Sequence, residues 1–138
     1  MLVLDTDVIV AGLRSPSGAS AALLDRVLDG RQSIALSTAL VLEYEAVALR
    51  PEHLAAAGLD EKRVLVVIDA LIAVAYPVTP HFRWRPQLRD PADELVLEAA
   101  VNASASAIVT FNHRHFKGAA QRFGLEILRP NEILERDR

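Results

Sequence analysis

Four side chains with oxygen donors stand beside the ends of short apolar segments, where they could act together on a charged substrate. Asp5 follows the first apolar run, Glu43 lies in the segment after the second, Asp93 opens a later segment, and Asn112 follows another run. If the runs are strands of one parallel sheet, all four side chains come to its carboxyl edge, where α/β proteins place their working groups. The chain therefore has candidates for one polar site built from distant segments.

Several of these acids also have a simpler interpretation. Asp5 and Asp7 could be loop carboxylates that cap the next helix. Asp90 suits an N-cap with Pro91 after it, and Asp93 then stands at the third helical position, where a carboxylate favours the helix dipole. Asp93 also begins an apolar stripe at +3, +4 and +7, which is the face turned toward the core. We interpret Asp90 as the cap and Asp93 as an acid facing a pocket.

Periodicity does not choose the acid in the segment after the second strand. Glu43 and Glu45 both have apolar neighbours at helical spacing. Burying a carboxylate among apolar neighbours costs free energy unless a cation pairs with it, although either side chain could also extend to water. Both alternatives stay open on the residues alone.

The charge on this set of acids indicates a bound cation. Carboxylates gathered without a cation repel one another, which raises at least one pKa. Oxygen ligands without thiolate suit Mg²⁺ or Mn²⁺, and the chain has no cysteine. Its four histidines do not make a convincing zinc site. Mg²⁺ held by carboxylates and water typically acts on phosphate esters, so the pattern indicates metal-assisted hydrolysis of a phosphate ester.

The elements that must position these groups alternate between strands and helices. Short apolar runs predict strands at residues 2–4, 33–36, 77–79, 107–110 and 125–128. Helical spacing and capping residues predict helices at 19–29, 39–49, 60–75, 91–106 and 114–123, with a final turn of helix at 131–135. This alternation implies an α/β domain with a mostly parallel sheet covered on both faces. No repeat or linker divides the chain, so we expect a single domain.

Composition excludes several classes of protein. An apolar share of 51% and a charged share of 24% exclude a disordered chain of 138 residues. The longest apolar stretch, residues 64–75, is too short to span a bilayer, and the four apolar residues before Asp5 are too few for a signal peptide. The lack of cysteine fits a reducing compartment, so we expect a cytoplasmic protein. With a net charge of −3, a nucleic-acid partner must be held by a local basic patch or by metal ions.

The order of the short motifs resembles the PIN domain family, and within it the VapC-type toxins of toxin–antitoxin systems. The matching pieces are Leu-Asp-Thr-Asp at 4–7, Leu-Glu-Tyr at 42–44, Asp-Pro-Ala-Asp-Glu at 90–94 and Thr-Phe-Asn at 110–112. Each motif is short, but their order covers nearly the whole chain. The resemblance implies a PIN-like three-layer α/β/α sandwich with a mostly parallel central sheet, as one domain over residues 1–138.

The resemblance also implies an activity, namely a Mg²⁺- or Mn²⁺-dependent endoribonuclease that cleaves RNA phosphodiesters with activated water. It favours Glu43 over Glu45. It assigns catalysis to Asp5, Glu43, Asp93 and Asn112, and metal binding to Asp5, Glu43, Asp93 and the auxiliary acid Asp90.

Two positions depart from the family pattern. Asn112 stands where the family often has Asp, and Asp7 stands where it commonly has Asn. The charge missing at Asn112 is thus partly regained at Asp7. We expect Thr6, Asp7 and Thr110 to hydrogen-bond around the ligating carboxylates and orient them.

Basic residues near this edge are candidates for holding substrate phosphates. Arg114 and Lys117 follow Asn112 closely. A loop at residues 80–89 is a further candidate, although it could equally be solvated surface. Its side chains of interest are Arg83, Trp84, Arg85 and Arg89.

The apolar segment 64–75 is expected to give one face to the core and another to a partner chain. Members of the resembled family commonly form homodimers and are blocked by an antitoxin protein. We therefore expect RNA, a cognate antitoxin and a second copy of the chain as partners, and no membrane.

Two alternative functions remain. A haloacid-dehalogenase-like phosphatase also begins with a buried strand and Asp-x-Asp, as at Asp5 and Asp7, but it needs a well-placed lysine. The chain has only Lys62 and Lys117. A non-catalytic PIN-like interaction module is the other alternative, motivated by Asn112.

Overall fold

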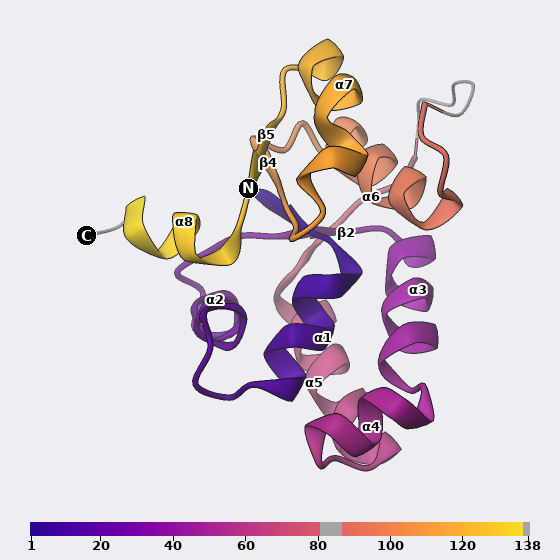
Figure 1. Ribbon diagram of the computed structural model, residues 1–138. Coiled ribbons are helices and arrows are strands. Elements are labelled where there is room, and N and C mark those ends of the chain that lie inside the picture. The colour runs from indigo at the N-terminus through magenta and orange to yellow at the C-terminus, as the bar shows by residue number, and fades with distance from the viewer. Residues whose placement is uncertain (81–86, 137–138) are drawn as a thin grey trace.

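The strands of the protein run parallel to one another in a computed structural model that describes residues 1–80 and 87–136 (Figure 1). The described strands are β1 (Leu2–Leu4), β2 (Ala35–Leu36), β3 (Tyr76–Pro77), β4 (Ala107–Val109) and β5 (Glu126–Leu128). β4 pairs with β1 on one side and with β5 on the other, and β2 pairs with β3. A parallel bridge between Leu2 and Ile34 joins the two groups in the order β3–β2–β1–β4–β5.

Helices lie on both sides of these strands. Figure 1 shows α6 and α7 on one side and α1 to α5 on the other. The described helices are α1 (Thr6–Arg14), α2 (Ala19–Leu28), α3 (Thr38–Ala48), α4 (Pro51–Ala57), α5 (Glu61–Val74), α6 (Pro91–Asn102), α7 (His113–Phe123) and α8 (Pro130–Arg136). This arrangement confirms the predicted α/β fold with a mostly parallel sheet.

The core sits between the central strands and the helices that cover them. Val3, Leu4, Ile108 and Val109 are fully buried, in strands that are apolar on both faces. Such continuous apolar runs are typical of parallel strands covered on both sides. Burying each of these side chains contributes roughly 1.5–3 kcal/mol. The core therefore holds the carboxyl ends of β1 and β4 side by side.

Local signals set where the helices on the site side begin. Ser37 caps α3 by accepting a hydrogen bond from the Leu40 amide at 3.1 Å. Asp90 caps α6 by accepting one from the Ala92 amide at 2.9 Å, with Pro91 at the first helical position. Both caps stand directly at the start of helices that carry candidate acids.

The structure differs from the predicted elements in three helices. The helix α1, which begins directly after β1, was not among those predicted. Nor was the seven-residue helix α4, which begins at Pro51 because proline suits a first helical position. The helix predicted over 91–106 ends at Asn102, since Ser104 adopts a positive φ of 52° and turns the chain back toward β4. Arg83, Trp84 and Arg85 lie outside the described residues.

The helix α5 has the two faces predicted for residues 64–75. Val64, Ile68 and Leu71 are buried in the core. Val66, Ile72 and Val74 are exposed. Within residues 1–80 and 87–136, no helix is long and apolar enough to cross a membrane.

Candidate active site

A cavity of about 690 Å³ opens at the carboxyl edge of β1 and β4. It is lined by four acids from two distant segments, Asp5, Asp7, Asp90 and Asp93. Thr6, Asn112 and His115 complete this acidic end. The parallel pairing of β1 with β4 brings Asp5 and Asn112, which follow these strands, to one place, and α6 begins there with Asp90 and Asp93.

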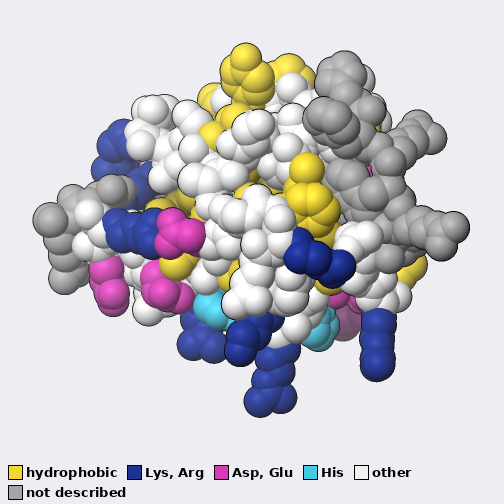
Figure 2. Space-filling model, turned by 90° about the horizontal axis from the view of Figure 1, so that it is seen from above, with side chains coloured by type: hydrophobic (Ala, Val, Ile, Leu, Met, Phe, Trp, Pro, Cys, Tyr) yellow, Lys and Arg dark blue, Asp and Glu magenta, His cyan; other side chains and the backbone are white. Residues whose placement is uncertain are grey.

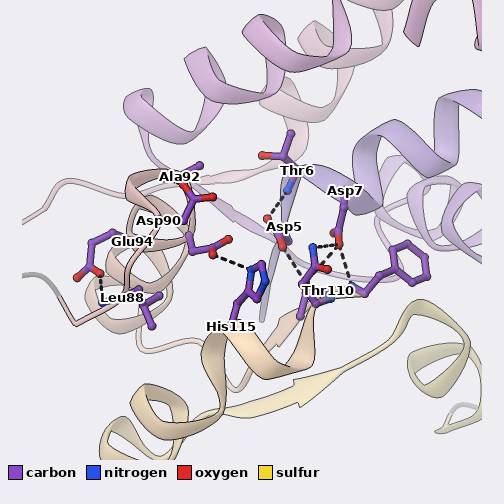
Figure 3. Close-up of polar contacts among 12 residues, drawn as sticks. Asp5, Thr6, Asp7, Leu88, Asp90, Ala92, Glu94, Thr110 and His115 are labelled. Carbon is purple, nitrogen blue, oxygen red and sulfur yellow. Dashed lines mark hydrogen bonds and ion pairs between the residues drawn. The ribbon is translucent and has the colours of Figure 1, made fainter. Parts of the chain in front are cut away.

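Asp5 is held in one orientation by both of its oxygens. It caps α1, with Oδ1 accepting a hydrogen bond from the Thr6 amide at 2.8 Å. Its Oδ2 accepts one from the Thr110 hydroxyl at 2.7 Å (Figure 3). Burial raises the pKa of Asp5, and these two hydrogen bonds partly offset the rise. Thr6 thus acts through its backbone amide and Thr110 through its side chain.

Asp7 links α1 to the segment after β4. Its Oδ2 accepts hydrogen bonds from the Phe111 amide at 3.0 Å and from Asn112 Nδ2 at 3.1 Å. Its Oδ1 is buried without a partner among the described residues. Burial, followed by repulsion from Asp5, raises the pKa of Asp7 to about 6. Asn112 therefore donates a hydrogen bond to Asp7, so the two residues that depart from the family pattern contact each other.

Asp90 and Asp93 have different surroundings at the start of α6. Asp90 is exposed and caps the helix. Asp93 is buried, and its Oδ2 lies 2.9 Å from Nδ1 of His115 on α7. Burial and repulsion from Asp5 raise the pKa of Asp93, while His115 lowers it. Asp5 is thus near enough to Asp93 to affect its ionisation.

Glu43 is not among the residues that line this cavity. It is half-buried on α3, whose position is set by its neighbour Tyr44. The Tyr44 hydroxyl donates a hydrogen bond to the Leu4 carbonyl, directly before Asp5. Val47, one helical turn after Glu43, does line the cavity. The structure therefore brings Asp5, Asp93 and Asn112 together and leaves the Glu43 side chain at their margin.

The acidic end has the chemistry of a site for a hard divalent cation. Burial, followed by repulsion from Asp5, raises the pKa values of Asp7 and Asp93, and the buried Oδ1 of Asp7 has no partner within the described part of the chain. A divalent cation would neutralise this charge with the oxygen donors that Mg²⁺ and Mn²⁺ prefer. No three acidic or histidine side chains of residues 1–80 and 87–136 are already arranged around one ion position.

The two predicted phosphate-binding residues lie on α7 and are both exposed. Arg114 lines a second hollow together with Asp90, Asp93 and His115. Lys117 lines a different hollow, away from the acids. Figure 2, the view onto the side that carries α7, shows Lys and Arg side chains gathered along one edge with histidines between them. Arg114 is thus nearer to the acidic end than Lys117.

Sequence reasoning missed four residues that line the cavity or bind its acids. His115 was given no role in the site, although it lies beside Asp93. Arg14, Arg50 and His53 line the end of the cavity away from the strands. Arg50 lies between α3 and α4, outside both helices, so helical spacing from Glu43 gave no signal for it.

Together the fold and the site define an α/β protein with a cavity of carboxylates at the carboxyl edge of its parallel sheet. The chain matches the model of the PIN domain over residues 1–114, so it belongs to the PIN domain family. PIN domains are generally nucleases that act on nucleic acid, usually with divalent metals. Neither the curated proteins nor the solved structures include a match to the chain.

Proposed function

We propose that this PIN domain is a Mg²⁺- or Mn²⁺-dependent endoribonuclease that hydrolyses phosphodiester bonds of RNA. One observation carries the proposal: acids that stand 88 residues apart in the sequence, Asp5 and Asp93, line one cavity, and the charge of Asp5 helps to raise the pKa of Asp93. Membership of a nuclease family and the cation-compatible donor set support it. The proposal takes residues 1–138 as one domain, because β5 completes the sheet that β1 begins.

In this proposal Asp5, Asp93, Asp90 and Glu43 would hold the cation. The chemistry supplied by the cation when bound is activation of water and neutralisation of phosphate charge. Asp5 is kept in place by Thr6 and Thr110, so its orientation does not depend on the substrate.

Two further residues would act on the substrate side of the same site. Asn112 has an amide that can position a water or a phosphate oxygen, and Asp7 holds that amide through Nδ2. Arg114, in the hollow beside Asp93, would hold a substrate phosphate. Lys117 would do so only for a longer substrate that reaches along α7.

The direct test is cleavage of single-stranded RNA with Mg²⁺ or Mn²⁺ and with EDTA. We expect wild-type cleavage that EDTA abolishes. Asp5→Asn and Asp93→Asn should reduce kcat by at least roughly a hundredfold, with unfolding transitions close to wild type. Asp25→Asn, on the exposed side of α2, is a matched control and should cleave normally.

Metal binding can be measured without RNA. Mg²⁺ or Mn²⁺ should raise the Tm of the wild type, because a ligand bound only to the folded state stabilises it by about 2.7 kcal/mol at a hundred times its Kd. The rise should be much smaller in Asp5→Asn. Wild-type protein that binds no metal and leaves RNA intact would instead favour a non-catalytic PIN-like module.

We further propose that the nuclease is the toxin of a type II toxin–antitoxin pair and works as a homodimer. The exposed apolar side chains on α3 and α5 support this proposal, since Leu42, Val66, Ile72 and Val74 form surface that a partner chain could cover. Expression in a bacterial host should arrest growth, and co-expression of the protein encoded beside it should restore growth. Expression of Asp5→Asn should be harmless; arrest by this variant would separate toxicity from RNA cleavage.

A further inference from the structure

The cavity that holds the acids has a second, basic end. Arg14 lies in the last turn of α1, Arg50 directly before α4, and His53 in the first turn of α4. All three side chains line the same cavity as Asp5 and Asp93. α1 runs from the strands to α4 (Figure 1), and its residues Asp7, Val10 and Arg14 line the cavity along the way. Three cationic or titratable groups from two segments are therefore turned toward one space.

These groups are not used by contacts within the described structure. Across residues 1–80 and 87–136, neither Arg14 nor Arg50 forms a salt bridge or a side-chain hydrogen bond, and both are exposed. Nδ1 of His53 is buried and has no hydrogen-bond partner there. Two unpaired guanidinium groups and an unpartnered nitrogen, on residues that line one cavity, indicate a place for an anion.

The basic end is too far from the acids to serve the same phosphate. Arg14 follows Asp5 by nine residues, which is about 13 Å along a helix axis at 1.5 Å per residue. The acids and the guanidinium groups share the cavity, yet in the described residues no ion pair joins them. A polyanion lying along α1 would meet the acidic end at one phosphate and the basic end at another.

We propose that Arg14, Arg50 and His53 form a binding subsite for a backbone phosphate of RNA that flanks the bond being cleaved. This inference rests on the proposed ribonuclease activity. Guanidinium groups bind phosphate through paired hydrogen bonds, and contact with the backbone fixes the register of a strand without reading its bases. The subsite therefore sets where along a strand the acids act and gives preference to substrates with a phosphate at that distance.

Kinetics on two lengths of RNA test the subsite. For a long single strand, Arg14→Gln and Arg50→Gln should each raise KM on the order of tenfold while kcat changes little. For a dinucleotide, which has no flanking phosphate, the variants and the wild type should have the same kcat/KM. Arg129→Gln removes the same charge outside the cavity and should behave as wild type on both substrates.

A neutral substitution in the RNA locates the contact. A single uncharged methylphosphonate linkage is placed at each position of a long strand in turn, and kcat/KM is measured for each of these substrates. The wild type should lose activity at one flanking position as well as at the cleaved bond. Arg14→Gln and Arg50→Gln should be insensitive at that flanking position, because the contact is already lost.

The outcomes separate this inference from the proposed activity. A wild type that cleaves RNA, with Arg14→Gln and Arg50→Gln showing unchanged KM on long strands, would overturn the subsite and leave the nuclease standing. Equal loss on the dinucleotide and on the long strand would also overturn it, since the arginines would then act at the cleaved bond. A wild type that cleaves no RNA would remove both proposals.

Discussion

His115 on α7 and Asp93 on α6 are joined by a contact of 2.9 Å between Nδ1 and Oδ2. Asp93 is only 8% exposed, whereas about half of the His115 side chain is exposed. The imidazole therefore covers one oxygen of a buried carboxylate from the solvent side. Because α6 and α7 pack against each other, the contact limits the orientations that this acid can take.

Loss of the His115 imidazole should disturb the orientation of the Asp93 carboxylate more than the stability of the fold. His115→Ala should lower kcat on RNA on the order of tenfold with little change in KM, since a hydrogen bond to a charged group contributes about 1.5–3 kcal/mol. His115→Asn, whose amide nitrogen can stand near the position of Nδ1, should recover most of the activity. Steady-state kinetics and thermal unfolding of both variants check this. Equal kcat in His115→Ala and the wild type would show that Asp93 needs no such partner.

Asp7 should make the stability of the protein depend on pH. Its pKa rises from 3.8 to about 6 on folding, so the unfolded chain ionises first as pH increases. Stability is therefore lost between those two values and stays reduced above about 6. Asp7→Asn should be more stable than wild type at neutral pH, by on the order of 1 kcal/mol after allowance for solvent screening, and similar to it near pH 4.

Urea unfolding of wild type and Asp7→Asn, in EDTA and at pH values on either side of about 6, measures this difference. Asn at position 7 keeps an oxygen that can accept hydrogen bonds from the Phe111 amide and from Asn112. The wild type and the variant therefore differ in the charge of this side chain and not in these hydrogen bonds. A stability difference that does not vary with pH would contradict the explanation by charge.

Thr110 joins the two sides of the site through one hydroxyl. Its Oγ1 donates to Asp5 at 2.7 Å and accepts from the Asn112 amide at 2.9 Å, and the residue is fully buried. Thr110→Val keeps the shape but removes both bonds, so it should lower the free energy of unfolding by about 1–3 kcal/mol. Thr110→Ser keeps the hydroxyl and should lose less. Chemical denaturation compares them, and a Val variant as stable as Ser would refute the role of the hydroxyl.

Glu43 and Glu45 can be separated by matched substitutions. Glu43 precedes Val47, which lines the cavity, by four residues on α3. Glu45 instead precedes the buried Ala48 by three. If Glu43 turns toward Asp5 when a cation binds, Glu43→Gln should weaken Mn²⁺ binding on the order of tenfold, while Glu45→Gln should not. Calorimetric titration with Mn²⁺ checks this, and the reverse order would assign the ligand to Glu45.

The positions of most elements follow from local patterns in the sequence. Continuous apolar runs predict β1 and β4, and Asp90 followed by Pro91 predicts where α6 begins. The acids Asp5 and Asp93 could be placed at one sheet edge because parallel strands end together. The helices α1 and α4 were not predicted. α4 begins at Pro51, and a proline can mark either the end of one helix or the first position of the next.

The amino-acid order alone thus determined the α/β class and the acids that follow its strands, because apolar periodicity and capping act over a few neighbouring residues. Only the tertiary structure decided that His115 meets Asp93, that Asn112 binds Asp7, and that Arg14 and Arg50 share the cavity of the acids. These pairings join segments far apart in the chain. They depend on the rotation of each helix about its axis and on the register of β1 against β4, which no local pattern specifies.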